Sequence, residues 1–249
     1  MKKFFASLYD LTSFSFRFFK EGAVPPYEIG EFAGHLENFG SRSLPLVSAI
    51  GLLMGLILAL QTKPTFERFG AESFLPAMVA ISVVRELGPV ITALIVAGRV
   101  SGGIGAEIAS MKVTEQIDAL EVSSVDPYRY LVVPRVLAGI FALPLLTAYA
   151  DLLSIIGAFI VMYVTGDMGW QLFTTSTLHS LSIADVVPGI AKTFVFGFII
   201  AIVGSYFGFR AKGGTEGVGK AATSAVVFAS FLVIVTDLVL VKIGILIFE

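Results

Sequence analysis

Five long apolar runs separated by short polar segments dominate the pattern of this chain, at residues 44–60, 73–105, 136–164, 192–209 and 221–248. About 20 predominantly apolar residues suffice for a helix to cross a bilayer. A helix also satisfies its own backbone hydrogen bonds in lipid. The pattern therefore predicts an all-α integral membrane protein with five transmembrane helices. Gly51 and Gly55 in the first run have the GxxxG spacing that lets another helix approach closely.

The first 43 residues have a different pattern from the rest of the chain. Residues 2–20 place Leu11, Phe14 and Phe18 on one helical stripe and charged residues on the opposite stripe. Such a helix is expected to lie in the bilayer interface. A second amphipathic segment follows, with His35 on a face that we expect to be solvated. The chain thus divides into N-terminal interfacial or elbow helices at 1–43 and a five-span domain at 44–249.

Composition supports the membrane class and excludes several chemistries. Hydrophobic residues make up 56% of the 249 residues and charged residues 14%, against about 25% charged in soluble domains. The chain has no cysteine, which excludes disulfides and thiolate metal sites. Its two histidines are far apart and no basic patch is present, so neither a metal site nor nucleic-acid binding is expected.

The lysines and arginines are distributed asymmetrically between the polar segments. With the N-terminus inside, the outer segments hold only Lys63 and Arg68, and residues 165–182 hold no lysine or arginine. Cytoplasmic loops are enriched in these residues. The N-terminus is therefore expected in the cytoplasm and the C-terminus on the opposite side.

Charged residues interrupt the apolar runs themselves, among them Arg85, Glu86, Asp151, Lys192 and Asp237. An ionised group at mid-bilayer costs about 3 kcal/mol on insertion scales, so it usually pairs or faces water. Neighbouring residues on a helix do not face each other. Arg85 and Glu86 are therefore expected to pair with residues on other helices, and the available partners are Asp151, Lys192 and Asp237. Such pairs would either fix helix packing or form the polar floor of a substrate path. Lys192 is expected at the outer start of the fourth span.

The second run ends in features that suggest a break and a short polar helix. Gly88-Pro89 predicts a kink, since Pro89 cannot donate a backbone hydrogen bond. Thr114 is expected to cap a helix at 115–123, with Glu115 in its first turn and Ile117 and Leu120 on one side. This pattern suits an ordinary interfacial loop helix as well as a docking helix.

Residues 214–221 nearly match the phosphate loop GxxxxGK[ST]. The last position is Ala221, which lacks the magnesium-binding hydroxyl, and the preceding segment is a predicted span rather than a strand. We therefore expect a flexible cytoplasmic loop here.

The stretch from Arg85 to Leu146 contains RELGP, AGR, VTEQIDAL and VDP in order. In these motifs the chain resembles the MlaE-type permeases of lipid ABC transporters. The resemblance implies a homodimeric permease in the bacterial inner membrane that binds two cytoplasmic ABC ATPase subunits and handles phospholipid. It also implies a partner outside the membrane with a mammalian-cell-entry domain. ATP and magnesium would bind the ATPase, so no cofactor and no catalytic residue are expected in this chain.

The resemblance also implies roles for particular residues. The family's coupling helix falls on Thr114, Glu115, Gln116, Ile117, Asp118 and Leu120. Its intramembrane polar positions fall on Arg85, Glu86, Lys192 and Asp237. Its lipid-contacting positions at the dimer cavity fall near Leu58, Phe66 and Phe69.

These inferences predict a permease subunit that moves phospholipid between the inner membrane and an extracytoplasmic lipid carrier. Two alternatives are an ion-coupled secondary transporter that uses Glu86 and Asp237 as proton carriers, and a membrane scaffold that transports nothing. The absence of an internal repeat in the sequence counts against the secondary transporter. Co-purification with an ATPase whose activity the chain changes would separate the three.

Overall fold

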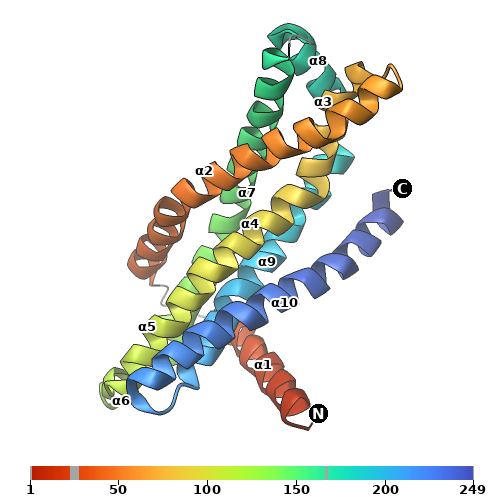
Figure 1. The fold of residues 1–249 in the computed structure, drawn as a ribbon. Coiled ribbons are helices and arrows are strands. Elements are labelled where there is room, and N and C mark those ends of the chain that lie inside the picture. Colours follow the sequence, from red (N-terminus) through yellow and green to blue (C-terminus); the bar gives the residue numbers. More distant parts are fainter. Residues whose placement is uncertain (1, 23–27, 166–167, 249) are drawn as a thin grey trace.

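The computed structural model describes residues 2–22, 28–165 and 168–248. The described part is a helical bundle without a strand, and five of its helical segments are long and apolar enough to cross a membrane (Figure 1). The all-α class and the five predicted spans are thereby confirmed. The spans run alternately along the long axis, so α6 (Gln116–Val122) lies at one end and α8 (Trp170–Ser180) at the other.

The first span is the 40-residue helix α2, Ile29–Arg68. The amphipathic segment before residue 44 and the first apolar run are thus parts of one helix. The segment after residue 62 also continues the helix, despite Pro64. A prediction from hydropathy separates these parts because it registers changes in polarity, whereas the backbone hydrogen bonds continue through them.

The second span is built from several helical pieces. η1 (Glu72–Phe74) and α3 (Leu75–Ser82) lead into a π-helical turn, η2 (Val83–Leu87). α4 (Gly88–Val96), a second π-helical turn η3 (Ala97–Ser101) and α5 (Gly102–Val113) follow. Pro89 lacks the N–H that would continue the regular ladder, so the wide turn at η2 comes directly before it.

The remaining spans are more regular. A π-helical turn, η4 (Tyr128–Val132), leads into α7 (Val133–Val164), and α9 (Ile183–Phe209) and α10 (Gly214–Phe248) complete the bundle. α9 begins nine residues before Lys192, so the predicted start of the fourth span was wrong. The predicted flexible loop at 214–221 was also wrong, because these residues form the first turns of α10.

Small residues bring α2 and α7 into close contact. A Cβ at Gly55 would collide with the carbonyl oxygen of Ser154, and one at Gly51 would lie 3.0 Å from the carbonyl oxygen of Ala150. The Ser154 hydroxyl donates to the Gly51 carbonyl at 2.7 Å. The GxxxG spacing thus marks a helix–helix contact within this chain.

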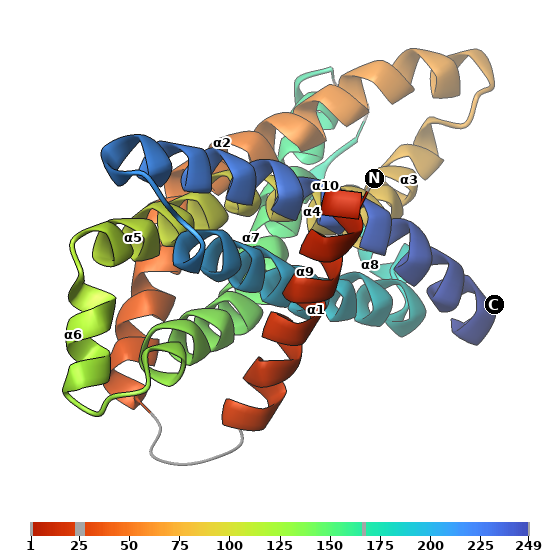
Figure 2. The same cartoon turned by 90° about the horizontal axis from the view of Figure 1, so that it is seen from below.

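Helix α1 (Lys2–Glu21) crosses the same end of the bundle as α6 (Figure 2). Its predicted apolar stripe packs on protein: Leu11 and Phe18 are buried, and the Phe14 ring lies 4.8 Å from that of Tyr128. Among the side chains described from Tyr9 onward, the aromatic residues Tyr9, Phe16 and Phe19 of this helix are exposed. The stripe therefore fixes α1 to the bundle, and a location at the bilayer interface stays a prediction.

Candidate functional site

Lys192 is the centre of a charged cluster inside the bundle. Its Nζ lies 2.6 Å from Oε2 of Glu86 and 3.2 Å from Oδ1 of Asp237, and it donates to the Arg85 carbonyl at 3.3 Å. The lysine is 5% exposed, and its partners come from η2 and α10. One ammonium group on α9 therefore joins three spans.

Arg85 directs its side chain to a different partner. Its Nη1 lies 3.5 Å from Oδ1 of Asp185, near the start of α9. The other oxygen of Asp185 accepts from the backbone N–H and the hydroxyl of Ser182, as the N3 residue of a capping box. Asp185 was not predicted from the sequence, because the fourth span was expected to begin only at Lys192. The Ser-x-x-Asp spacing was the available signal.

The two halves of this site are held together by a close approach of backbones. A Cβ at Gly189 would collide with the carbonyl oxygen of Val84, so only glycine lets α9 lie this near to η2. Lys192 follows Gly189 by almost one helical turn and therefore faces the same neighbour.

A cleft opens beside the cluster. It has a volume of about 260 Å³ and is lined by both polar and apolar groups, including Ser82, Arg85, Glu86, Pro188, Lys192 and Leu240. Ligand pockets for drug-sized molecules usually measure about 300–1,000 Å³, so this cleft suits waters or a small polar group rather than a whole lipid. With every group ionised, two cations face three carboxylates, and one negative charge is left over.

Asp151, one of the partners proposed for Arg85 and Glu86, does not belong to the cluster. It is buried on α7, and its Oδ1 makes no hydrogen bond to any described residue. This oxygen lies where a Cβ of Gly88 would stand, next to the π-helical turn.

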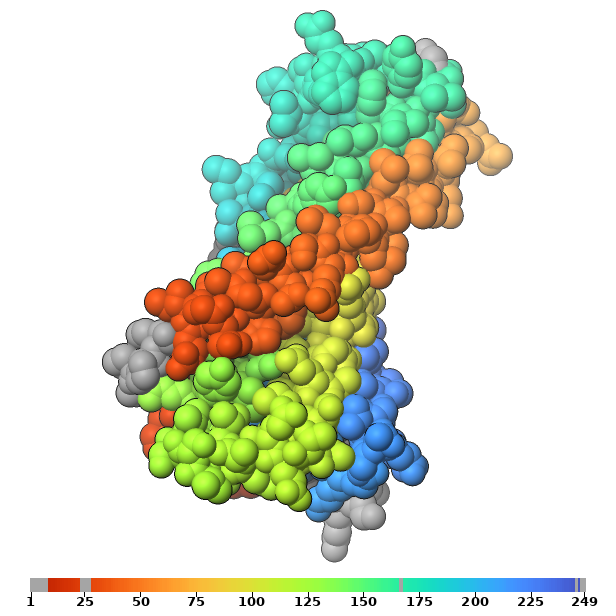
Figure 3. Space-filling view, turned by 90° about the vertical axis from the view of Figure 1, so that its left-hand side faces the viewer, coloured from red at the N-terminus to blue at the C-terminus, as the bar shows by residue number. Residues whose placement is uncertain are grey.

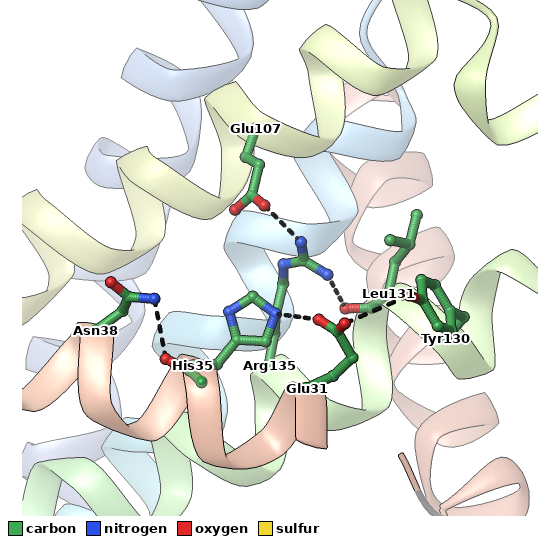
Figure 4. A network of polar contacts seen from close by, with 8 residues as sticks. Glu31, His35, Asn38, Glu107, Tyr130, Leu131 and Arg135 are labelled. Carbon is green, nitrogen blue, oxygen red and sulfur yellow. Dashed lines mark hydrogen bonds and ion pairs between the residues drawn. The ribbon is translucent and has the colours of Figure 1, made fainter. Parts of the chain in front are cut away.

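A second polar network, not predicted from the sequence, lies nearer the α6 end (Figure 4). Arg135 is 3% exposed, and its guanidinium contacts Oε1 of Glu107 and the Leu131 carbonyl, both at 2.7 Å. His35 lies beside it with Nε2 3.8 Å from Oε2 of Glu31, and its side chain is 12% exposed. The expected solvated face for His35 was therefore wrong, because α7 packs against this side of α2 and brings Arg135 next to the imidazole.

The polar helix α6 stands out from the bundle with one buried anchor. Ile117 is buried and Leu120 is partly buried, whereas Thr114, Glu115, Gln116 and Asp118 are exposed. Thr114 does not cap α6: it ends α5, and its hydroxyl donates to the Ser110 carbonyl at 2.9 Å. Glu115 has a positive φ of 61° at the junction, so the chain turns sharply here.

The three predicted lipid-contacting residues lie on the second half of α2 and directly after it. Leu58 is partly buried against a core of α2, α3 and α7 residues. Phe66 is partly exposed and Phe69 is 80% exposed. Leu58 therefore packs within this chain, while the phenylalanines are free to meet lipid or another chain.

The fold and these sites define a multi-pass membrane protein that carries ionisable side chains within its apolar spans. The family model of Permease MlaE matches residues 32–243. Among curated proteins, a "Probable ABC transporter permease protein" of Rickettsia felis is 42% identical over 235 residues, covering 94% of this chain and 91% of its own length.

More distant relatives also match over most of this chain. A "Probable ABC transporter permease protein" of Synechocystis is 34% identical over 80% of this chain and 75% of its own length. "Protein TRIGALACTOSYLDIACYLGLYCEROL 1, chloroplastic" of Arabidopsis thaliana is 33% identical over 82% of this chain and 59% of its own length. The chain belongs to the MlaE permease family and is a permease subunit of a transporter.

Proposed function

We propose that this chain is the transmembrane subunit of an ABC transporter that moves phospholipid between the inner membrane and a lipid carrier outside it. A separate ATPase on the side of α6 binds ATP and magnesium and supplies the energy. Two copies of the chain form the membrane core, with Leu58, Phe66 and Phe69 near a lipid cavity between them. The carrier contains a mammalian-cell-entry domain and docks at the opposite end.

The observation that carries this proposal is the physical connection between α6 and the charged cluster. α6 is attached to the end of α5, and α5 continues through η3 and α4 to Arg85 and Glu86. Lys112 Nζ lies 3.1 Å from Oδ1 of Asp118, and this ion pair attaches α6 to the end of α5. A partner that moves α6 would therefore also move the charged cluster, because α5, η3 and α4 form a continuous helical connection between them.

Two further observations support the lipid substrate and the orientation. The chloroplast relative is named for a diacylglycerol lipid. α6 also shares its end of the bundle with the N-terminal helix, since Arg17 Nη2 lies 2.7 Å from Oδ2 of Asp126, just after α6. The excess of lysine and arginine in the polar segments on that side supports a cytoplasmic location for this end.

Reconstitution with the cognate ATPase tests the proposal. The double variant Glu115→Lys/Asp118→Lys should lose ATPase binding by pull-down while keeping the thermal stability of the wild type in detergent. Glu216→Lys is the matched control, because it reverses an exposed charge at the start of α10, outside α6. If the double variant binds the ATPase with unchanged affinity, α6 is not the docking element. Lipid transfer that continues without ATP but requires a proton gradient would favour the ion-coupled alternative instead.

A further inference from the structure

A second and larger cleft lies at the other end of the same span, between the first half of α2 and the η3–α5 segment. Its volume is about 510 Å³. Helix α2 contributes His35, Phe39 and Arg42, and the second span contributes Arg99 and Glu107. We call it the α2–α5 cleft. Figure 3 shows α2 crossing this face of the molecule diagonally, and the yellow-green α5 segment lies below it in the view.

The charges of the α2–α5 cleft are unbalanced toward positive. Arg42 and Arg99 are exposed and form no ion pair or hydrogen bond with any described residue. Glu107 is the one acid among the lining residues, and the buried guanidinium of Arg135 already engages it at 2.7 Å. Figure 4 shows Arg135 reaching from α7 to Glu107 behind the ring of His35. The two free arginines therefore present positive charge that nothing in this part of the chain neutralises.

Both arginines stand at the end of an uncharged, apolar stretch of the chain. Arg42 precedes the apolar run at 44–60 by two residues. Arg99 ends the uncharged stretch that follows Glu86, 13 residues or about 20 Å further along the helix. Half of a hydrocarbon core about 30 Å thick measures about 15 Å. If Glu86 lies near mid-membrane, both guanidinium groups reach the depth of the lipid phosphates.

We propose that the α2–α5 cleft binds the phosphate group of a membrane phospholipid. Arg42 and Arg99 approach the phosphate oxygens from two different helices, and the planar guanidinium fork matches phosphate geometry. Phe39 supplies an apolar wall for the glycerol and the first acyl carbons. The volume lies within the range of about 300–1,000 Å³ that is usual for ligand sites. The proposal rests on the proposed function only for the placement in a membrane, because the site is separate from both the Lys192 cluster and α6.

Lipid titration of the purified full-length chain, followed by native mass spectrometry, tests the proposal without any ATPase. The probes are dioleoylphosphatidylglycerol, dioleoylglycerol and inorganic phosphate. We expect the phospholipid to bind at least about tenfold more tightly than the diacylglycerol, since losing a charged hydrogen bond has this effect. Competition by inorganic phosphate at the concentration of the lipid would show a free-anion site and overturn the lipid assignment.

Substitutions locate the site. Arg42→Gln/Arg99→Gln should weaken phosphatidylglycerol binding at least about tenfold, and Arg42→Lys/Arg99→Lys should restore part of it. Arg68→Gln is the matched control, as an exposed arginine at the opposite end of α2. Equal lipid binding by the glutamine double variant and the wild type would overturn the proposal.

A photo-crosslinker covers the case in which the double variant fails to fold. Asn38 lines the cleft, and Ser41 is exposed nearby on the same helix but is not among the lining residues. A crosslinker at position 38 should capture phospholipid, and one at position 41 should capture markedly less. Equal capture at both positions would indicate bulk bilayer contact. Capture of a second copy of the chain at position 38 would show that a dimer contact covers the cleft. Either result contradicts the proposal, and neither depends on ATPase coupling.

Discussion

The Nζ of Lys192 lies 2.6 Å from Oε2 of Glu86, although 106 positions separate the two residues in the chain. This contact joins α9 to the π-helical turn η2, and the same ammonium reaches Asp237 on α10. Three spans thus share one cation, and the energetic consequences can be measured.

Lys192→Met should lower the free energy of unfolding by about 3 kcal/mol, because two carboxylates lose their counter-ion within the bundle. Glu86→Gln should cost less, since its side chain is 41% exposed and Asp237 still pairs with the lysine. Unfolding in detergent should give a coupling energy of about 1–3 kcal/mol in the double-mutant cycle. Lys242→Met, an exposed lysine on α10, is the control. Strictly additive costs would mean that the two charges do not interact.

Gly189→Ala should destabilise the protein by about 1–3 kcal/mol, as is usual for overpacking. The added Cβ collides with the carbonyl oxygen of Val84, which is backbone and cannot rotate away. Gly219→Ala is the matched control, since it lies within α10 and its Cβ would meet nothing within 4 Å. This control should be neutral or slightly stabilising, because alanine is the better helix former. A melting temperature for Gly189→Ala at or above that of the wild type would refute the tight contact.

Gly55→Ala should separate α2 from α7 and weaken the hydrogen bond from Ser154 to the Gly51 carbonyl. The expected cost is again about 1–3 kcal/mol. The distance between the two helices can be followed by crosslinking cysteines introduced at the exposed positions 53 and 152. The yield is compared with that of the same cysteine pair in the otherwise wild-type chain. Gly40→Ala, on the same helix with open space around it, should leave that yield unchanged.

Helix α1 should depend on its buried aromatic side chains more than on its ion pairs. Phe18 is 6% exposed, so Phe18→Ala should cost about 2–3 kcal/mol of local stability. Asp126→Asn breaks an exposed pair with Arg17 and should cost less than about 1 kcal/mol. Hydrogen exchange of the α1 amides measures both effects. Faster exchange in Asp126→Asn than in Phe18→Ala would reverse this ranking.

The existence of the five spans followed from the apolar runs, because a helix in lipid needs that length and composition. Their ends did not follow. Asp185, Pro188 and Lys192 lower the hydropathy of α9 over its first turns, yet the backbone is helical from Ile183. The start of α10 was missed for a similar reason, since its glycines at 214, 217 and 219 resemble a loop in composition.

The polar residues were easier to find than their partners. Charges in apolar runs are visible in the sequence, and the structure brings Glu86, Lys192 and Asp237 together. The partners of Arg85 and Arg135 are Asp185 and Glu107, and both depend on how helices pack side by side. Sequence spacing along one helix carries no information about that. The functional roles of these residues stay predictions.

The two π-helical turns of the second span have a consequence for its tolerance of length changes. Each wide turn corresponds to one residue inserted into a regular helix, and one residue rotates everything beyond it by about 100°. The direction in which α6 points, relative to the face that carries Glu86, is therefore set by residue number as much as by residue type. Deletion of a single uncharged residue between Val83 and Ser101 would keep a fully helical span and an unchanged charge content. It would nevertheless rotate α6 by about 100° around the axis of the second span. The exposed side chains of α6 would then no longer face the partner that binds them.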